Sequence, residues 1–481
     1  MVSLLSTLLA SSSALNAYEQ VLEVTQSNVA NSSTPGYAKQ TQELYALPLN
    51  PSLGVTGGVK AGVVQDSRDQ YAEQNVWRQS VSLGQANQNV SSLTALQSLF
   101  DISGDTGIPK ALNNLFSSFS AWGQSPTDTE ARQTVIDNAT NLANSFQQAA
   151  TGIQSVEQDT NQQLQTTVTQ VNNLVGLLQG YNTQILGGDR NDAGLESQVY
   201  STLEQLSQYV DINVTPQADG SVTVLLGDQT PLLVGAQQYS IGSTFQQPDD
   251  AVYTQAPPAA HILASDGTDI TASVTTGQLG ALLNLRNQVL PSYIGDAYQP
   301  GDLNTMAKQF ADCVNQALTS GEISGGPNAQ AGVALFSYDT TNDADVAATL
   351  SVDPTVTPGQ LAAIDPGPPE VANGIPLALA QLAAPEDPAD EINGASFTEF
   401  YGNMASRIGS ALNDATSQQT VQQSAVAQAQ NLRQQSSGVN LDEEAMTVVE
   451  FQRAYEANAQ LVTILNQLTE DAINILASTT G

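Results

Sequence analysis

Apolar residues recur at alternating steps of three and four at both ends of this chain. This is the spacing of a coiled-coil seam. It predicts an N-terminal helix of about 30 residues, roughly 45 Å long, and a second helix from residue 441 onward. Because neither helix can bury a single apolar stripe alone, we expect the two to pair. The expected assembly interface consists of Leu4, Leu8, Leu15, Tyr18, Leu22, Val29, Val448, Phe451, Tyr455, Asn458, Val462, Leu465 and Leu468.

A break separates each terminal helix from the rest of the chain. In NVANSSTPGYAKQ (28–40), the proline disfavours helical backbone at the residue before it, and the following glycine permits a turn. In SGVN (437–440), the asparagine is the expected N-cap, and the three acids after it favour the positive end of the helix dipole. The expected hinge residues are Asn28, Asn31, Pro35, Gly36, Tyr37, Gly438, Asn440, Asp442, Glu443 and Glu444.

The pattern between the two breaks changes several times. Apolar periodicity predicts helices at 71–100, 109–122, 126–185, 193–209, 277–292, 302–319 and 397–435. Residues 41–70 look extended or turn-rich, and alternation with period two predicts strands from 211 to about 273. Residues 320–394 are rich in Gly, Pro, Ala and Asp, and they predict a small insert with strands at VALFSY (333–338) and AATLSV (347–352).

This order of elements predicts an α+β multidomain protein. The expected parts are a terminal coiled-coil assembly domain (1–40 with 440–481), a mainly helical long-helix bundle (41–210 with 276–319 and 395–439), a β-rich part (211–275) and an acidic Pro/Gly-rich outer insert (320–394). The parts are nested, with the terminal helices in one layer and the β-rich material outermost.

Charge and rare residues exclude several classes of function. The formal net charge is −35, so we expect neither nucleic acid nor an anionic membrane surface as a partner. The chain has one cysteine, Cys313, and one histidine, His261, which nearly excludes a His-based metal site and a triad of the Ser-His-Asp or Cys-His kind. We therefore expect no enzyme activity, no cofactor and no metal. There is also no run of 18 apolar residues, the length a membrane-spanning helix needs.

Two terminal motifs carry a resemblance to a known family. SALNAYEQVLEVTQSNVANSSTPGYAKQ (13–40) and SSGVNLDEEAMTVVEFQRAYEANAQLVTILNQL (436–468) resemble the paired motifs of bacterial flagellar rod, hook and hook-associated axial proteins. The SGVNLDEE opening and PTDTEARQTVI (126–136) are similar to the hook-associated members that join hook to filament.

The resemblance implies a structural subunit that polymerises axially through its terminal helices. It implies self-association in a ring, the hook protein and a second junction protein as neighbours, and an export chaperone at the C-terminal helix. It also implies secretion through the flagellar export apparatus, without a cleaved signal peptide, to the extracellular hook–filament junction. A signal peptide needs a basic start, and the first basic residue here is Lys39.

Two alternatives remain open from the sequence. Another axial role, as a hook or distal rod subunit, predicts a β-dominated core. A secreted carbohydrate-active or proteolytic enzyme would use carboxylates of the acidic insert, with Asp339, Asp343 and Asp345 as candidates.

Overall fold

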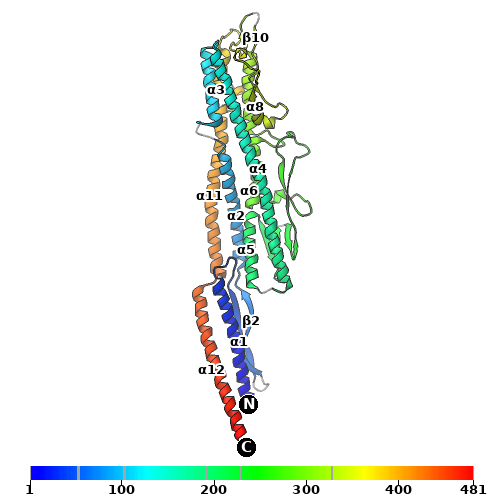
Figure 1. Cartoon of the computed structure of the whole chain (residues 1–481), viewed down its shortest axis with the longest axis vertical. Helices are drawn as coiled ribbons and strands as arrows, with labels where there is room; N and C mark the ends of the chain where they lie inside the picture. The colour runs from blue at the N-terminus through cyan, green and yellow to red at the C-terminus, as the bar shows by residue number, and fades with distance from the viewer. Residues whose placement is uncertain are drawn as a thin grey trace.

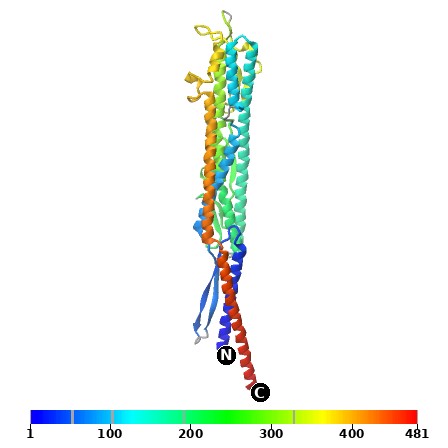
Figure 2. The ribbon, with the colours of Figure 1, turned by 90° about the vertical axis from the view of Figure 1, so that its left-hand side faces the viewer.

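The protein is an elongated rod with both chain ends at the same tip (Figure 1). The computed structural model describes residues 2–50, 55–100, 105–189, 192–227, 229–326 and 329–479. A narrow terminal arm carries the chain ends, and a broader body of long, nearly parallel helices continues the rod (Figure 2).

The terminal arm has three layers. It consists of α1 (Val2–Asn31), α12 (Leu441–Thr479) and the antiparallel hairpin of β1 (Gln40–Asn50) with β2 (Val55–Asp66). The helix α1 lies in the middle, packed against α12 on one side and against the hairpin on the other (Figures 1 and 2). The two termini therefore form one unit, although they lie at opposite ends of the sequence.

Long helices build the body. They are α2 (Gln70–Gln97), α3 (Gly107–Gln124), α4 (Thr129–Gly187), α5 (Ala193–Tyr209), α8 (Asp302–Ser320) and α11 (Phe397–Ser437). The longest, α4, begins where the Asp128 carboxylate caps the Glu130 amide and ends at Gly188, whose φ of +134° stops the helix. Helix α6 (Gly277–Asn284) continues through a π-helical turn, η3 (Leu285–Val289), into α7 (Pro291–Ile294).

Small sheets flank the half of the body nearer the arm (Figure 1). The four-stranded antiparallel sheet has the order β3 (Ile212–Pro216), β4 (Val222–Leu226), β5 (Thr230–Val234), β6 (Gln237–Gln238), and β7 (Gly242–Gln246) pairs with β8 (Ala259–Leu263). Residues 320–394 hold two more ladders, β9 (Glu322–Ser324) with β10 (Gln330–Ala331) and β11 (Phe336–Ser337) with β12 (Ser351–Val352). They also hold the short helices α9 (Val346–Thr349) and α10 (Gly374–Gln381). Single 3₁₀ turns are η2 (Thr271–Ser273), η4 (Asp343–Asp345), η5 (Pro358–Gln360) and η6 (Pro388–Asp390).

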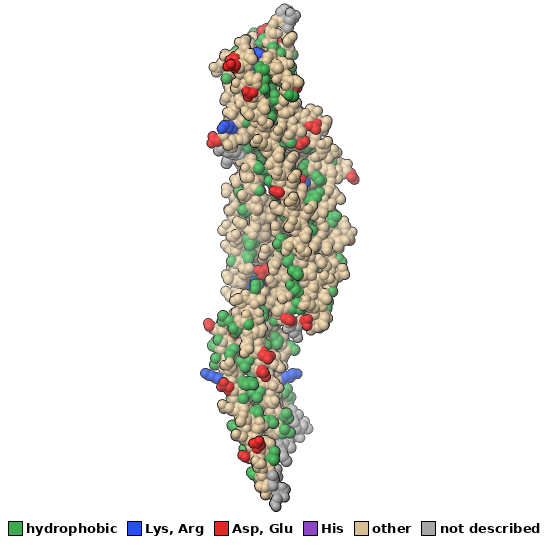
Figure 3. Space-filling model, in the orientation of Figure 1, with side chains coloured by type: hydrophobic (Ala, Val, Ile, Leu, Met, Phe, Trp, Pro, Cys, Tyr) green, Lys and Arg blue, Asp and Glu red, His purple; other side chains and the backbone are tan. Residues whose placement is uncertain are grey.

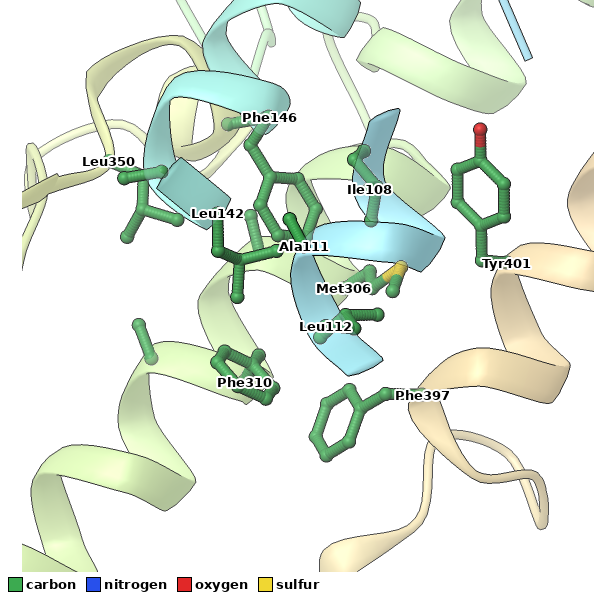
Figure 4. Packing of buried hydrophobic residues seen from close by; sticks show 14 of the residues in the cluster. Ile108, Ala111, Leu112, Leu142, Phe146, Met306, Phe310, Leu350, Phe397 and Tyr401 are labelled. Atoms are coloured by element: carbon green, nitrogen blue, oxygen red, sulfur yellow. The ribbon is translucent and has the colours of Figure 1, made fainter. Parts of the chain in front are cut away.

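Two separate hydrophobic cores stabilise the body. In the core distal to the arm, α3, α4, α8 and α11 meet around Phe310, whose ring packs edge-on against Phe116, Phe336 and Phe397 (Figure 4). The proximal core joins α4, α5 and α6 to the strands. Neither core includes a residue of the terminal arm, so the body buries its own apolar surface without it.

The predicted fold class is confirmed, and helix 193–209 coincides with α5. The predicted strand at 347–352 is wrong over its first half, because Val346–Thr349 is helical and only Ser351–Val352 forms a ladder. Val346, Ala347 and Leu350 instead point into the distal core, and that burial outweighs local strand preference. Within the described residues, no helix combines the length and apolarity needed to span a membrane.

Candidate assembly interface and hinge

The predicted pairing of the two terminal helices is present in the arm. The rings of Tyr18 and Phe451 lie 5.7 Å apart across the helix pair, within the range of favourable aromatic contacts. A further set of predicted interface residues is half-buried along the pair: Leu4, Leu8, Leu15, Leu22, Val448, Asn458, Val462 and Leu465. Asn458 donates within its own helix, to the Ala454 carbonyl oxygen at 3.1 Å, rather than across the pair.

Three predicted seam residues lie outside the interior of this pair. Val29, Tyr455 and Leu468 are 42%, 37% and 49% exposed. The most buried positions of α1 are instead mostly small ones: Ser11, Ala14, Ala17, Val21, Thr25 and Asn28. The prediction considered only the two helices and not the hairpin. Because α1 lies between α12 and the hairpin, only small side chains fit at its most buried positions. The part of these residues in contacts between subunits stays a prediction.

Asn28 is the centre of the hinge. It is 1% exposed, and its amide group makes four hydrogen bonds. Its Nδ2 donates to the Gln40 carbonyl oxygen at 2.8 Å and to Glu444 Oε2 at 3.0 Å, and its Oδ1 accepts from the Gln40 amide at 2.8 Å and the Tyr37 hydroxyl at 2.9 Å. One side chain thus joins α1, the first residue of the hairpin and α12. Because all four bonds are buried or partly buried, losing them is expensive.

Lys39, the residue before the hairpin, joins this turn to α12 through charge. Its Nζ lies 3.0 Å from Glu444 Oε1 and 3.2 Å from Glu443 Oε2. Burial disfavours the charged amine, but the bonds to Glu444 and Glu443 outweigh it and raise the pKa of Lys39 above its ordinary value. The Lys39 amide also donates to the Ser437 carbonyl oxygen at 2.8 Å, which ties the hinge to the end of α11.

The TPGY turn packs the hinge against the body. Gly36 has φ +77°, and a Cβ there would lie 2.4 Å from the Ser197 carbonyl oxygen of α5, so the position needs glycine twice over. Pro35 itself is exposed. Asn31 stabilises the turn locally, donating to the Ser27 carbonyl oxygen at 3.0 Å and accepting from the Thr34 hydroxyl at 3.2 Å. Burial raises the pKa of the Tyr37 phenol.

The second break is similarly specific. A Cβ at Gly438 would lie 2.3 Å from the Gln434 carbonyl oxygen, so glycine is required there by close packing rather than by its backbone angles. Asn440 Oδ1 accepts from the Asp442 amide at 3.1 Å, as expected for an N-cap. Glu443 and Glu444 follow and bind Lys39.

A buried charge network supports the hinge from the body side. Arg68, whose side chain is 2% exposed, bonds to Glu73 at 2.7 Å, to Glu196 at 2.8 Å and to the Gly36 carbonyl oxygen at 2.9 Å. Its guanidinium also lies 3.7 Å from the centre of the Tyr200 ring. Burial raises the pKa of the Glu196 carboxyl, and Arg68 opposes that rise.

Arg433 of α11 completes the network. It reaches Glu73 at 3.2 Å and Glu204 at 2.7 Å, so α2, α5 and α11 are joined beneath the turn. Sequence reasoning missed these residues. The only feature of the sequence that could have indicated them is the scarcity of basic residues. The chain has 12 Lys and Arg among 481 residues, and two of the arginines lie in this network.

A polar hollow of about 310 Å³ lies beside this network, between the turn at 32–37 and the end of α11.

The residues considered for an enzyme or metal site make local contacts instead. The Asp339 carboxylate accepts from Thr341, His261 contacts Asp269 at 2.7 Å, and burial raises the pKa of Cys313 to about 11. In the segments that the structure describes, no three His, Cys, Asp or Glu side chains are grouped as metal ligands would be.

Three flagellar family models match separate parts of the chain. The family described as "Flagellar hook-associated protein FlgK helical domain" matches residues 93–336. "Flagellar basal body rod FlgEFG protein C-terminal" matches 431–475, and "Flagella basal body rod protein" matches 8–37.

Full-length relatives agree with these matches. Flagellar hook-associated protein 1 of Bacillus subtilis (strain 168) is 25% identical and covers 96% of both chains. The protein of the same name from Escherichia coli (strain K12) is 24% identical, over 96% of this chain and 98% of its own. The solved structure of the flagellar hook junction protein FlgK from Burkholderia pseudomallei has the same fold, with a TM-score of 0.63 at 16% identity, over 75% of this chain and 99% of that one.

Proposed function

Because this chain belongs to the flagellar hook-associated protein 1 family and is therefore a structural protein of the bacterial flagellum, we propose that it forms the junction between hook and filament. The observation that carries the proposal is the construction of the terminal arm. Both chain ends lie there, apart from the two cores of the body, and among the described residues most of the large exposed apolar side chains belong to the arm.

In this proposal the arm is the assembly element. Its helices lie along the axis of the flagellum and associate with the arms of neighbouring copies in a ring. Green apolar surface continues over the arm in Figure 3, whereas a self-sufficient monomer would bury most of such a patch. The neighbours along the axis are the hook protein on one side and a second junction protein on the other.

The hinge fixes the direction of the arm relative to the body. Asn28, Lys39 and the buried Arg68 network tie α1, the hairpin and α12 to α5 and α11. Assembly on the arm therefore sets where each body points. Exposed apolar side chains of α12, among them Met446, Leu461 and Ile464, are available to an export chaperone before assembly, which would keep α12 from associating prematurely.

Immunogold labelling of isolated flagella tests the proposed position. Label confined to the boundary of hook and filament is the expected result. Label along the hook or within the rod would instead favour the second candidate, a hook or distal rod subunit, and would overturn the junction proposal.

A further inference from the structure

The helix α12 carries a second heptad stripe whose large side chains stay exposed in the part of the protomer that the structure describes. One stripe, with Val448, Phe451, Val462 and Leu465, faces α1. The other lies roughly a third of a turn away around the helix. It consists of Met446, Ala457, Leu461, Ile464 and Leu468, with Glu450 and Arg453 in the positions between the first two. Its large members are 49–66% exposed, for example Met446 at 66% and Leu461 at 49%.

The hairpin also leaves a face uncovered. Tyr45, Leu47 and Val63 are exposed on it, Val63 at 69%. Lys60 pairs with Tyr45 across the two strands and is exposed as well. The hairpin lies on the opposite side of α1 from α12, so the two uncovered faces point away from one another (Figures 1 and 2). They cannot meet within one chain.

The two faces carry charges that can pair between copies. Lys60 is the one base of the hairpin's described residues, whereas the stripe of α12 carries Glu450 close to its start. A base on the surface is rare in a chain with 12 Lys and Arg against 47 Asp and Glu, so a contact between Lys60 and an acid of the next copy is favoured. Figure 3 shows basic side chains on both edges of the arm.

We propose that the outer face of the hairpin of one copy packs on the second stripe of α12 of the next copy. This inference rests on the proposed function, because it names the surfaces through which copies associate. Two different faces on opposite sides of one arm make a heterologous contact, which generates a ring or helix rather than a closed dimer. A small shift between the two arms along their length then places Lys60 opposite Glu450.

Cysteine cross-linking of assembled flagella tests this pairing. Cells lacking the native protein would produce the full chain with Val63→Cys together with Met446→Cys, both at exposed sites and at similar distances from the body in the proposed pairing. Native Cys313 is half-buried, and its pKa of about 11 keeps it unreactive near neutral pH. The double variant is expected to give a ladder of cross-linked oligomers after mild oxidation. The matched control pairs Val63→Cys with Leu177→Cys on the exposed face of α4, and no ladder is expected.

The results separate the pairing from the junction proposal. Dimers from Val63→Cys alone would indicate a like-to-like contact and overturn the pairing, as would swimming cells whose double variant stays monomeric. If the cysteine variants fail to assemble, exchanging the charges of Lys60 and Glu450 tests the pairing instead. Lys60→Glu is expected to reduce swimming several-fold, and adding Glu450→Lys is expected to restore it; no restoration contradicts the pairing. If immunogold labelling of the native protein places it away from the hook–filament boundary, that result counts against the proposed function and not against the pairing of the two faces.

Discussion

At the scale of residues, the hinge depends on a few polar side chains that each bind several partners. Asn28 accepts two hydrogen bonds at Oδ1 and donates two from Nδ2, and Lys39 binds two carboxylates. Substituting such a residue leaves its buried partners without hydrogen bonds, and that loss costs more than the bonds were worth. The hinge is therefore sensitive to single substitutions that would be neutral on a solvated helix.

Asn28→Ala is expected to loosen the hinge by about 2–3 kcal/mol, because Gln40, Tyr37 and Glu444 lose a buried partner. Hydrogen exchange at the Gln40 amide and the last turn of α1 measures this as a faster local opening. Asn16→Ala, at an exposed site of the same helix, is the matched control and should change stability by less than about 0.5 kcal/mol. Equal protection in the two variants would show that Asn28 has no special part in the hinge.

Alkaline pH is expected to open the hinge. The pKa values of Lys39 and Tyr37 are raised in the folded protein. Their contribution to stability is therefore complete below the ordinary pKa values of 10.5 and 10.0 and is lost as the pH rises through the higher folded values. Hydrogen exchange in the arm, compared at neutral and strongly alkaline pH after correction for intrinsic rates, measures the loss. The double variant Lys39→Met, Tyr37→Phe should show a much flatter dependence; an unchanged one would contradict this assignment.

The sequence predicted the positions of the hinge but not the contacts that its residues make. Gly36 and Asn440 lie in turns that the sequence marks, and Asn28 and Glu444 lie in the ends of α1 and α12 beside them. Turn residues together with the family resemblance of the two motifs pointed to these positions. Arg68 and Arg433 were missed because their partners lie far away along the chain: Glu196 is 128 residues from Arg68, and Glu204 is 229 from Arg433. Only the fold brings such groups together.

At the scale of elements, helix periodicity was the reliable signal. The long amphipathic run predicted at 126–185 is α4 (Thr129–Gly187), and the C-terminal run is α12 (Leu441–Thr479). The predictions that were wrong concern residues whose structure depends on contacts with another element. The interior of α1 is set by the hairpin as well as by α12, and residues 346–349 are helical because they pack into the distal core. Periodicity within one segment carries no information about either contact.

Phe310→Ala is expected to destabilise the body by about 3–5 kcal/mol, because its fully buried ring contacts three other phenylalanines. Urea unfolding followed by circular dichroism measures the change. Leu177→Ala removes a large apolar side chain that is 51% exposed on α4, and it should cost far less. Similar losses in the two variants would mean that the aromatic cluster does not dominate the distal core.

At the scale of the whole molecule, two functions are divided between two regions. The body holds two cores of its own, whereas the arm contributes to neither core and has apolar residues on its outside. A single helix pair with a hairpin buries little surface, so we expect association with neighbouring arms to stabilise this region more than its internal contacts do. The division of the chain into domains stays a prediction, and the arm is the part on which it can be tested.

Deletion of residues 1–30 tests most directly whether the arm carries assembly. The truncated protein is expected to remain soluble and helical, with a cooperative thermal transition close to that of the full chain, because both cores stay intact. In cells lacking the native protein, it is expected to be absent from isolated flagella. Immunogold label at the hook–filament boundary from this truncated chain would contradict the account.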